Sequence, residues 1–275
     1  MRSRLDARTY LPFLATSVYL DALANQARVI GALMLRDMRT RFGRTLFGYV
    51  ITVAWPLSHL LILMTVYLVM RSIIPFGTSP AVFFATGLLP YILFLYPSRM
   101  IMMSVVQNHP LLYFPIVKSF DVILARGILE VITAFWVTTI FCFVLILFRV
   151  DITPIYPEEA LMAVLATIYF AFALGFLGAV IYKVFRGWIV VHILFVILLY
   201  FTSGALFLPS ALPDTTQYFL WFNPLLHCVE WLRSAYYDGY SYGLLTKEYL
   251  LGISTAVLFA GLVAERALRG IILQA

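Results

Sequence analysis

The chain has 275 residues, of which 63% are hydrophobic and only 12% are charged, and its formal net charge is +6. Soluble domains carry roughly a quarter charged residues, so this composition excludes an ordinary water-soluble domain. It predicts an all-α integral membrane protein, because a backbone in lipid must satisfy its own amides, and apolar runs of this length do so as helices.

Residues 1–44 precede the first long apolar block and carry eight arginines. We interpret them as a cytoplasmic N-terminal segment. Beyond residue 25 the pattern predicts an amphipathic helix along the inner headgroups, with Val29 and Leu33 on one side and Arg28 and Arg36 on the other. The alternative is a basic flank that only fixes topology. The first 25 residues superficially resemble a signal peptide, but their apolar run is interrupted, so we expect them to be retained, with no assigned role.

Residues 45–275 form the second predicted domain and contain six apolar blocks. The first five have 21 to 27 residues and can cross a hydrocarbon core of ~30 Å at about 1.5 Å per residue. The sixth is the shortest. In the fourth block, Gly175 and Gly178 would allow a close approach to another helix. We therefore expect six transmembrane helices: Phe47–Met70, Val82–Val106, Val122–Phe148, Ala160–Tyr182, Trp188–Leu208 and Leu250–Ala264.

The lysines and arginines outside these six blocks, together with Arg126 at the inner end of the third block, are unequally divided between the two sides of the membrane. One side has 14 of them and the other has four. Cytoplasmic loops carry the excess of Lys and Arg, so both termini are expected in the cytoplasm. The positive net charge therefore reflects topology, and no nucleic-acid partner is needed to explain it.

The stretch QNHPLLYFPIVKSFDVILAR, residues 107–126, lies between the second and third blocks. Pro110 and Pro115 divide it into pieces too short to cross a bilayer, and its polar side chains require a surface. On the predicted orientation that surface is cytoplasmic. This loop is therefore the best place for a soluble partner to push on the membrane part.

Two charged residues fall well inside predicted spans, deeper than Arg126 at the inner end of the third block. Arg99 and Glu130 lie seven and eight residues from the cytoplasmic ends of adjacent antiparallel blocks, at a depth of roughly 10–12 Å. An isolated charge at such a position costs ~2.5–3.5 kcal/mol or more, so a partner or a water-filled cavity is expected. We predict an intramembrane ion pair between them that fixes helix packing. The alternative is a contact with substrate.

The last outer loop contains the aromatic stretch from Gln217 to Tyr237, which is broken at Asn223-Pro224. It is too short and too broken to cross the membrane. We expect two short re-entrant helices that dip into the outer leaflet and join at this break. Glu230 and Arg233 are three residues apart and are expected to pair on one helix face.

The sequence lacks the motifs of common catalytic and nucleotide-binding sites. None of its three lysines follows a glycine, so the Gly-x-x-x-x-Gly-Lys phosphate loop is missing, and so are the Gly-x-Ser-x-Gly and His-Glu-x-x-His motifs. Its two cysteines imply no disulfide framework, and its four histidines are scattered. We therefore predict no catalytic, cofactor or metal site in this chain, and any energy source lies elsewhere.

Several motifs, in their order and spacing, resemble the membrane permeases of type-2 ABC exporters and, within them, the capsular-polysaccharide branch. The similarity covers nearly the whole chain after residue 25. The residues that carry it are Arg36–Arg44 (RDMRTRFGR), Gly48-Tyr49, Trp55-Pro56, Gly87-Leu88-Leu89-Pro90, Asn108–Arg126, Asn223-Pro224-Leu225 and Glu230-Trp231-Leu232-Arg233.

The resemblance implies a half-transporter in the bacterial inner membrane: a homodimer docked on two copies of a separate ATPase, which binds ATP and Mg. Residues 25–44 would be the family's interface helix, and residues 217–237 its re-entrant helices. Periplasmic co-polymerase and outer-membrane export proteins would receive a lipid-linked polysaccharide. The contact with the ATPase would be made by Asn108, His109, Pro110, Leu111, Tyr113, Phe114 and Lys118.

Aromatic residues suit sugar transport, because their rings offer flat apolar faces to the C–H faces of pyranoses. The competing explanation is that such rings face lipid or other helices. The candidates for a substrate lining are Tyr91, Phe94, Tyr96, Tyr169, Phe172 and Tyr200.

Other functions remain open on the sequence. The cargo of the same mechanism could be an O-antigen, a teichoic-acid-like polymer or a drug. From a different class, the chain could be an integral-membrane transferase for lipid-linked sugars, with His109, Glu130 or His227 as the base. That alternative needs polar groups at one depth, and the sequence offers only Arg99 and Glu130. A scaffold without a transport role is the third alternative.

Overall fold

The computed structural model describes residues 7–42, 46–70, 76–77, 79–240 and 242–274. The described part is helical and contains no strand. Its elements are α1 (Ala7–Phe42), α2 (Leu46–Met70), α3 (Pro80–Gln107), η1 (His109–Tyr113), α4 (Ser119–Leu147), α5 (Pro157–Val184), α6 (Trp188–Phe201), η2 (Pro209–Ala211), α7 (Asp214–Trp221), α8 (Pro224–Tyr236), η3 (Tyr242–Leu244) and α9 (Lys247–Gln274).

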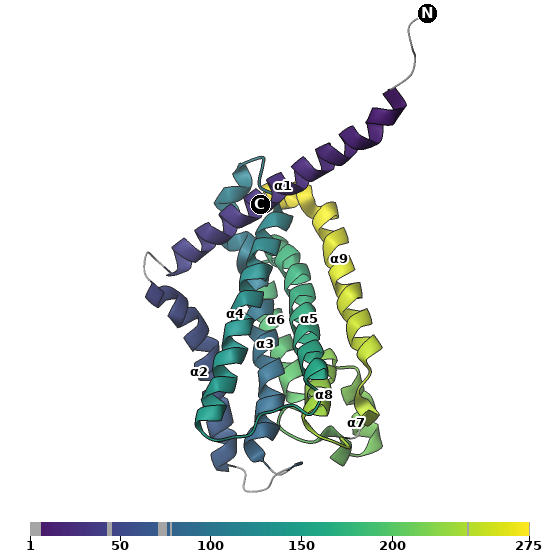
Figure 1. Ribbon diagram of the computed structural model, residues 1–275. Helices are drawn as coiled ribbons and strands as arrows, with labels where there is room; N and C mark the ends of the chain where they lie inside the picture. The colour runs from purple at the N-terminus through teal and green to yellow at the C-terminus, as the bar shows by residue number, and fades with distance from the viewer. Residues whose placement is uncertain (1–6, 43–45, 71–75, 78, 241, 275) are drawn as a thin grey trace, which may run out of the picture.

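The long apolar helices run side by side along one axis (Figure 1). Helix α1 crosses one end of this bundle, and η1 and the last turns of α9 lie at the same end. Helices α7 and α8 lie at the opposite end. Within the described residues, five helices are long and apolar enough to cross a membrane, namely Val50–Met70, Pro80–Gln107, Ser119–Leu147, Pro157–Val184 and Lys247–Leu268.

Helix α3 is the centre of the bundle. Pro80 begins it at the first helical position, where a missing amide hydrogen costs nothing, and Asn108 ends it. Pro90 and Pro97 lie inside the helix, which neighbouring helices allow in a membrane protein. The most apolar 18-residue stretch of α3 is 83% buried, against 22% for α2. Helix α2 is therefore peripheral, and most of its surface is left for lipid or another chain.

Helix α5 packs closely along α3, as the glycines of the fourth apolar block predicted. A Cβ atom on Gly175 would lie 2.8 Å from the carbonyl oxygen of Ser98 and from Cβ of Ile101. A Cβ atom on Gly178 would lie 3.1 Å from the Met102 side chain. Real Cβ atoms essentially never make contacts as short as those at Gly175, so glycine is required there for the two backbones to approach each other, while an added Cβ atom at Gly178 would need the Met102 side chain to shift.

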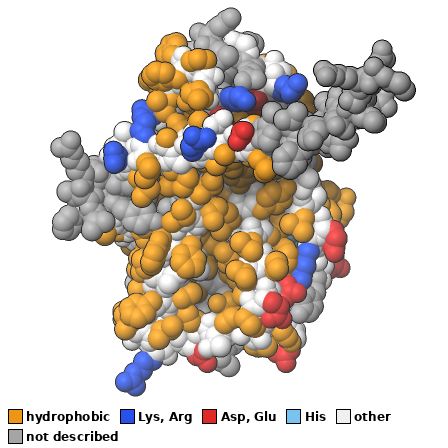
Figure 2. All heavy atoms as spheres, turned by 45° about the horizontal axis from the view of Figure 1, so that its top comes forward, with side chains coloured by type: hydrophobic (Ala, Val, Ile, Leu, Met, Phe, Trp, Pro, Cys, Tyr) orange, Lys and Arg blue, Asp and Glu red, His pale blue; other side chains and the backbone are white. Residues whose placement is uncertain are grey.

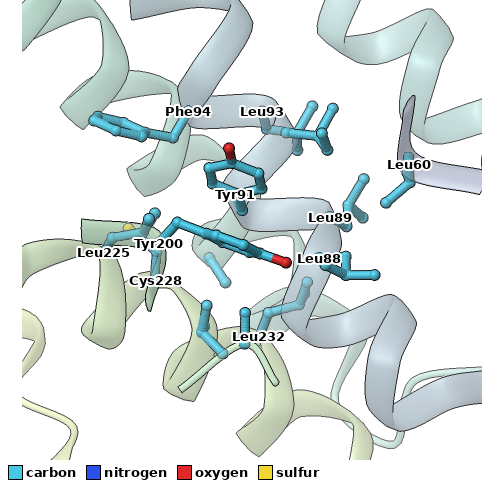
Figure 3. Packing of buried hydrophobic residues seen from close by; sticks show 14 of the residues in the cluster. Leu60, Leu88, Leu89, Tyr91, Leu93, Phe94, Tyr200, Leu225, Cys228 and Leu232 are labelled. Carbon is cyan, nitrogen blue, oxygen red and sulfur yellow. The ribbon is translucent and has the colours of Figure 1, made fainter. Parts of the chain in front are cut away.

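A core of aliphatic and aromatic side chains joins α3 to α6 and α8 (Figure 3). The rings of Tyr91 and Tyr200 stack with their centroids 4.0 Å apart. Leu88, Leu225 and Cys228 are fully buried in the same cluster. This packing attaches the short helix α8 firmly to the long ones.

The predicted spans agree with the observed helices except in three places. Helix α6 ends at Phe201, so the predicted span from Trp188 to Leu208 is wrong in length: 14 residues reach only about 21 Å. The chain turns at Gly204, which has a φ of +73°. The last helix, α9, is longer than predicted, and α1 is one 36-residue helix that begins well before residue 25.

Candidate functional site

The first candidate region is the η1 elbow, which we define as residues 108–118, between α3 and α4. Leu112 is buried and holds the elbow against the bundle. Tyr113, Phe114 and Ile116 are 74%, 59% and 67% exposed. The elbow lies at the end of the bundle near α1 (Figure 1). An exposed apolar group of this kind is typical of a contact with another protein.

Asn108 attaches the elbow to α1 and α3. Its side-chain amide donates to the carbonyl oxygen of Ser104 at 3.0 Å, within α3. Its side-chain oxygen accepts a hydrogen bond of 2.8 Å from Arg36 of α1. A movement of the elbow would therefore displace α1 as well as α3.

The far side of the elbow is attached to α1 through Asp121. One carboxylate oxygen accepts from the backbone amide of Lys118 at 3.1 Å and so caps the start of α4. The other accepts from the side-chain amide of Gln26 at 3.0 Å. Helix α1 is thus bonded to both ends of the elbow.

A buried chain of charges leads from α1 into α4. Arg126 pairs with Asp37 of α1 at 2.7 Å and with Glu130, one turn further along α4, at 2.5 Å. Arg126 and Glu130 are each 4% exposed. Removing one member of a buried pair leaves a charge uncompensated and costs about 3–5 kcal/mol, so this chain fixes the position of α1 on α4.

The elbow also carries His109, one of the residues singled out above. Partial burial, together with the nearby charges of Lys183 and Arg186, lowers the pKa of His109. Its imidazole is therefore neutral at neutral pH. Its ring contacts the ring of Tyr113 edge to face, with centroids 5.3 Å apart.

The predicted ion pair between Arg99 and Glu130 is wrong. The structure pairs Glu130 with Arg126, and no ion pair joins Arg99 to Glu130 in the described part of the chain. The two residues lie at similar depth, but Glu130 points into the packed bundle, whereas Arg99 is exposed. Depth can be counted along a sequence, but the direction of a side chain around its helix depends on packing.

Arg99 instead lines an open groove between α2 and α3. The groove has a volume of about 440 Å³. Tyr96, one of the predicted lining residues, lies in it and shares a 3.0 Å hydrogen bond with His59. The complete lining is Trp55, Ser58, His59, Ile62, Leu95, Tyr96 and Arg99.

Three of the other predicted lining residues belong to the core. Phe94 has no exposed surface and stacks on Phe170, and Tyr91 and Tyr200 stack on each other. Their prediction as lining is wrong, because the rings of α3, α5 and α6 fill the interior of the single chain.

Two more predicted lining residues are half-buried and lie apart from the groove. The hydroxyl group of Tyr169 is bonded to Thr255 of α9 at 3.0 Å. Phe172 covers Gly127 of α4. Neither contact creates a surface for a sugar ring.

At the opposite end of the bundle, the two predicted short helices are present as α7 and α8, joined at Asn223. The side chain of Asn223 donates to the carbonyl oxygen of Leu199 at 2.8 Å and accepts from the amide of Leu225 at 2.8 Å. Asn223 therefore provides hydrogen-bond partners for a backbone carbonyl group near the end of α6 and for a backbone amide group at the start of α8.

The predicted pair of Glu230 and Arg233 is confirmed, at 3.6 Å. Arg233 is fully buried, donates to the carbonyl oxygen of Ala205 at 3.0 Å, and lies 4.0 Å from the ring centroid of Phe83. Glu230 also accepts a 2.8 Å hydrogen bond from Tyr240. The pair thus connects α8 to α3 and to the loop after α6.

Sequence reasoning missed a second charged group at this end. Glu159, at the start of α5, accepts from Lys247 at 2.7 Å and from the indole nitrogen of Trp231 at 2.6 Å. The Lys247 ammonium lies 4.8 Å from the centroid of the same indole. These residues come from three distant parts of the sequence, so no local signal could have found the group.

The chain matches the family described as ABC-2 type transporter over residues 28–237. That range contains the described parts of α1 beyond residue 28, the η1 elbow, α7 and α8. The chain is 32% identical over 247 residues to the polysialic acid transport protein KpsM of Escherichia coli, which is 88% of this chain and 93% of KpsM.

Two other proteins have similar coverage. The capsule polysaccharide export inner-membrane protein BexB of Haemophilus influenzae is 31% identical over 254 residues, 90% of this chain and 93% of BexB. The capsule polysaccharide export inner-membrane protein CtrC of Neisseria meningitidis serogroup A is 27% identical over 263 residues, 92% of this chain and 96% of CtrC.

Proposed function

The chain belongs to the ABC-2 type transporter family, and on that premise we propose that it is the permease subunit of an exporter that moves a lipid-linked capsular polysaccharide across the bacterial inner membrane. The observation that carries the proposal is its match to KpsM, CtrC and BexB over nearly their whole lengths. CtrC and BexB are named as capsule polysaccharide export inner-membrane proteins, and KpsM is named as a polysialic acid transport protein.

In this proposal two copies of the chain bind two copies of a separate ATPase, which holds ATP and Mg. The ATPase binds the elbow at the exposed apolar side chains of Tyr113 and Phe114. The other predicted coupling residues surround this contact. Asn108, Asp121 and Arg126 connect the elbow and α4 to α1. Closure of the ATPase dimer would push the elbow and move α1, α3 and α4 together.

We propose six membrane crossings, with both termini in the cytoplasm. Helix α5 ends near α1, and α9 starts from the opposite end of the bundle (Figure 1). The chain therefore has to cover the length of the bundle once more between them, through α6 and the segment up to η2. In this topology α7 and α8 lie on the outer side as re-entrant helices, and α1 lies along the inner surface as the interface helix.

Two features of the surface fit this placement. Hydrophobic side chains cover the flank of the bundle, and Lys and Arg side chains gather toward the end at which α1 lies (Figure 2). A cytoplasmic membrane surface carries such a positive excess. Periplasmic co-polymerase and outer-membrane export partners would then meet the end that carries α7 and α8.

The same architecture suits export of an O-antigen, a teichoic-acid-like polymer or a drug, and the cargo is assigned here from the relatives. The transferase alternative loses its support, because its three candidate bases are far apart in the fold. His109 lies in the elbow, and Glu130 is paired with Arg126 inside α4. His227 lies in α8 and is bonded to Trp221 and to the amide of Thr246.

Deletion of the gene, with complementation by the wild-type chain, tests the proposal. We expect polysaccharide to accumulate in the cytoplasm and to disappear from the cell surface, and an ATPase subunit to co-purify with the complementing chain. Loss of polysaccharide synthesis would support the transferase, and unchanged surface polysaccharide would contradict the proposed export.

A further inference from the structure

The groove between α2 and α3, which we call the α2–α3 groove, has a more polar lining than a neighbouring groove on α2. A second groove of nearly equal volume, about 420 Å³, lies on another side of α2 against α4 and is lined by Val50, Val53, Ala54, Leu57, Trp136 and Ile140. This lining is entirely apolar and therefore suits a lipid acyl chain. The α2–α3 groove, of about 440 Å³, instead contains a hydroxyl, an imidazole, a phenol and a guanidinium group.

We infer that the α2–α3 groove binds an anionic sugar of the exported polymer, a pyranose that carries a carboxylate or a phosphate, with the anion on Arg99 and the ring against Trp55 and Tyr96. The inference rests on the proposed export function and deepens it, because it names the charge class of the substrate and the residues that hold it.

Arg99 supplies the first argument. It is eight residues from the end of α3, about 12 Å inside the candidate span Pro80–Gln107, and its side chain is exposed in the groove. The structure gives it no ion pair with any described residue, whereas Arg126, Arg233 and Lys247 are all paired. A charge at such a depth costs ~2.5–3.5 kcal/mol or more when it is alone in lipid, so Arg99 needs water or an anion beside it, and the open groove has room for an anion.

The geometry of the Arg99 guanidinium group restricts which anions the groove can bind well. Its planar fork matches the two oxygens of a carboxylate or a phosphate, and such charge-assisted hydrogen bonds are about twice as strong as neutral ones. An apolar tail or a neutral sugar would leave that charge unsatisfied. The groove volume falls within the range of about 300–1,000 Å³ found for small-ligand sites, so it suits a short part of a polymer.

The second argument is the aromatic wall. Trp55 is 70% exposed, and Tyr96 is fixed by its hydrogen bond to His59, whose ring meets Tyr96 edge to face with centroids 5.9 Å apart. Exposed ring faces beside a cation accept the C–H face of a pyranose. Ser58 and His59 add hydrogen-bonding groups for sugar hydroxyls.

Equilibrium binding to the full chain with its ATPase subunit, in nanodiscs of zwitterionic lipid, tests the inference. The probes are a fluorescently labelled sialic acid hexamer, labelled maltohexaose as the neutral control, and glucose 1-phosphate as an unlabelled competitor. We expect saturable binding of the acidic hexamer and weaker binding of maltohexaose. Competition by glucose 1-phosphate would extend the site to phosphates, and its absence would restrict the site to carboxylates.

Arg99→Gln is expected to weaken binding of the acidic hexamer at least about tenfold and to leave maltohexaose unchanged. Arg99→Lys should keep more of the affinity, and Trp55→Ala should lose several-fold. Two matched controls should bind as the wild type does: Arg28→Gln removes an exposed charge whose hydrogen bonds to described residues stay within α1, and Trp136→Ala changes the apolar groove. If Arg99→Gln does not assemble, Arg99→Lys and Trp55→Ala decide the test.

Three results would overturn the inference: no saturable binding of the acidic hexamer to the wild-type chain, wild-type affinity in both Arg99→Gln and Trp55→Ala, or loss of binding when phosphatidylglycerol is added to the nanodiscs. The last result would make a lipid headgroup the occupant. These failures are distinct from failure of the proposed function, because the deletion strain would still lose its surface polysaccharide.

Discussion

The guanidinium group of Arg126 lies 2.7 Å from the carboxylate of Asp37, which joins two helices that are 89 residues apart in the chain. The same guanidinium binds Glu130 one turn further into α4. A helix that crosses the end of the bundle is thereby connected to a helix of its interior. In the proposed mechanism, a push at the α1 end reaches the membrane part through this connection.

A double-mutant cycle tests this connection. Residues in direct contact show interaction energies of about 0.5–3 kcal/mol, so the destabilisations caused by Asp37→Ala and Arg126→Ala should not add. The readout is the free energy of unfolding of each purified variant, measured with denaturant, together with export in cells. Asp21→Ala, on an exposed face of α1, is the matched control and should be neutral. Strict additivity of the two changes would mean that the pair does not act as a unit.

The exposed apolar tip of the elbow should carry affinity for the ATPase. Tyr113→Ala and Phe114→Ala remove large exposed side chains, so folding should be unaffected. Interface anchors of this kind contribute about 2 kcal/mol or more, which corresponds to a roughly 30-fold loss of affinity. Co-purification of the ATPase measures the effect. Phe143→Ala, on an exposed face of α4, is the control, and an equal loss there would show that the elbow is not the contact.

The close contact of α3 and α5 predicts a strong effect at one glycine. Gly175→Ala would put a Cβ atom 2.8 Å from the Ser98 carbonyl oxygen, and overpacking of this kind costs about 1–3 kcal/mol. Gly252→Ala is the control, because nothing lies within 4 Å of its added Cβ atom. Thermal unfolding in detergent compares the two variants. A stability of Gly175→Ala equal to that of Gly252→Ala would refute the predicted close approach.

Removal of the buried cation at the other end should be costly. Arg233→Met would leave Glu230 without its cation, with only Tyr240 still donating to it, and the carbonyl oxygens of Ala205 and Phe207 without their donor, at about 3–5 kcal/mol. The expected result is a chain that inserts but unfolds at much lower temperature. Arg28→Met, at an exposed position, should unfold like the wild type. Normal stability of Arg233→Met would mean that α8 is held by its apolar contacts alone.

The long helices could be predicted from the sequence because the length and continuity of their apolar runs determine them. The predicted Val82–Val106 and Ala160–Tyr182 lie within α3 and α5 and end within three residues of them. The apolar run after Trp188 continues to Leu208, but the helix ends at Phe201. There Asn223, from a distant part of the chain, binds the freed carbonyl oxygen of Leu199.

The charged groups were harder to predict, because their partners depend on the direction of each side chain. We predicted that Glu130 pairs with Arg99 because the two lie at similar depth in the membrane. Arg126, however, stands four residues before Glu130, which is the ordinary spacing of an ion pair within one helix. The partner of Asp37 was not predicted, because Arg126 stands 89 residues further along the chain and only the packing of α1 on α4 brings the two together. The groove at Trp55 and His59 had no signal of its own, since it exists only where α2 meets α3.

The central claim is that the elbow lies in the cytoplasm, where the ATPase can bind it. Labelling of a single cysteine tests this most directly: Ile116→Cys, at an exposed position of the elbow, is introduced into a chain whose Cys142 and Cys228 are replaced by alanine, and intact cells are treated with a membrane-impermeant maleimide. We expect no labelling until the inner membrane is opened, followed by labelling that the co-expressed ATPase subunit blocks. Labelling of the cysteine in intact cells, from the periplasmic side, would contradict the account.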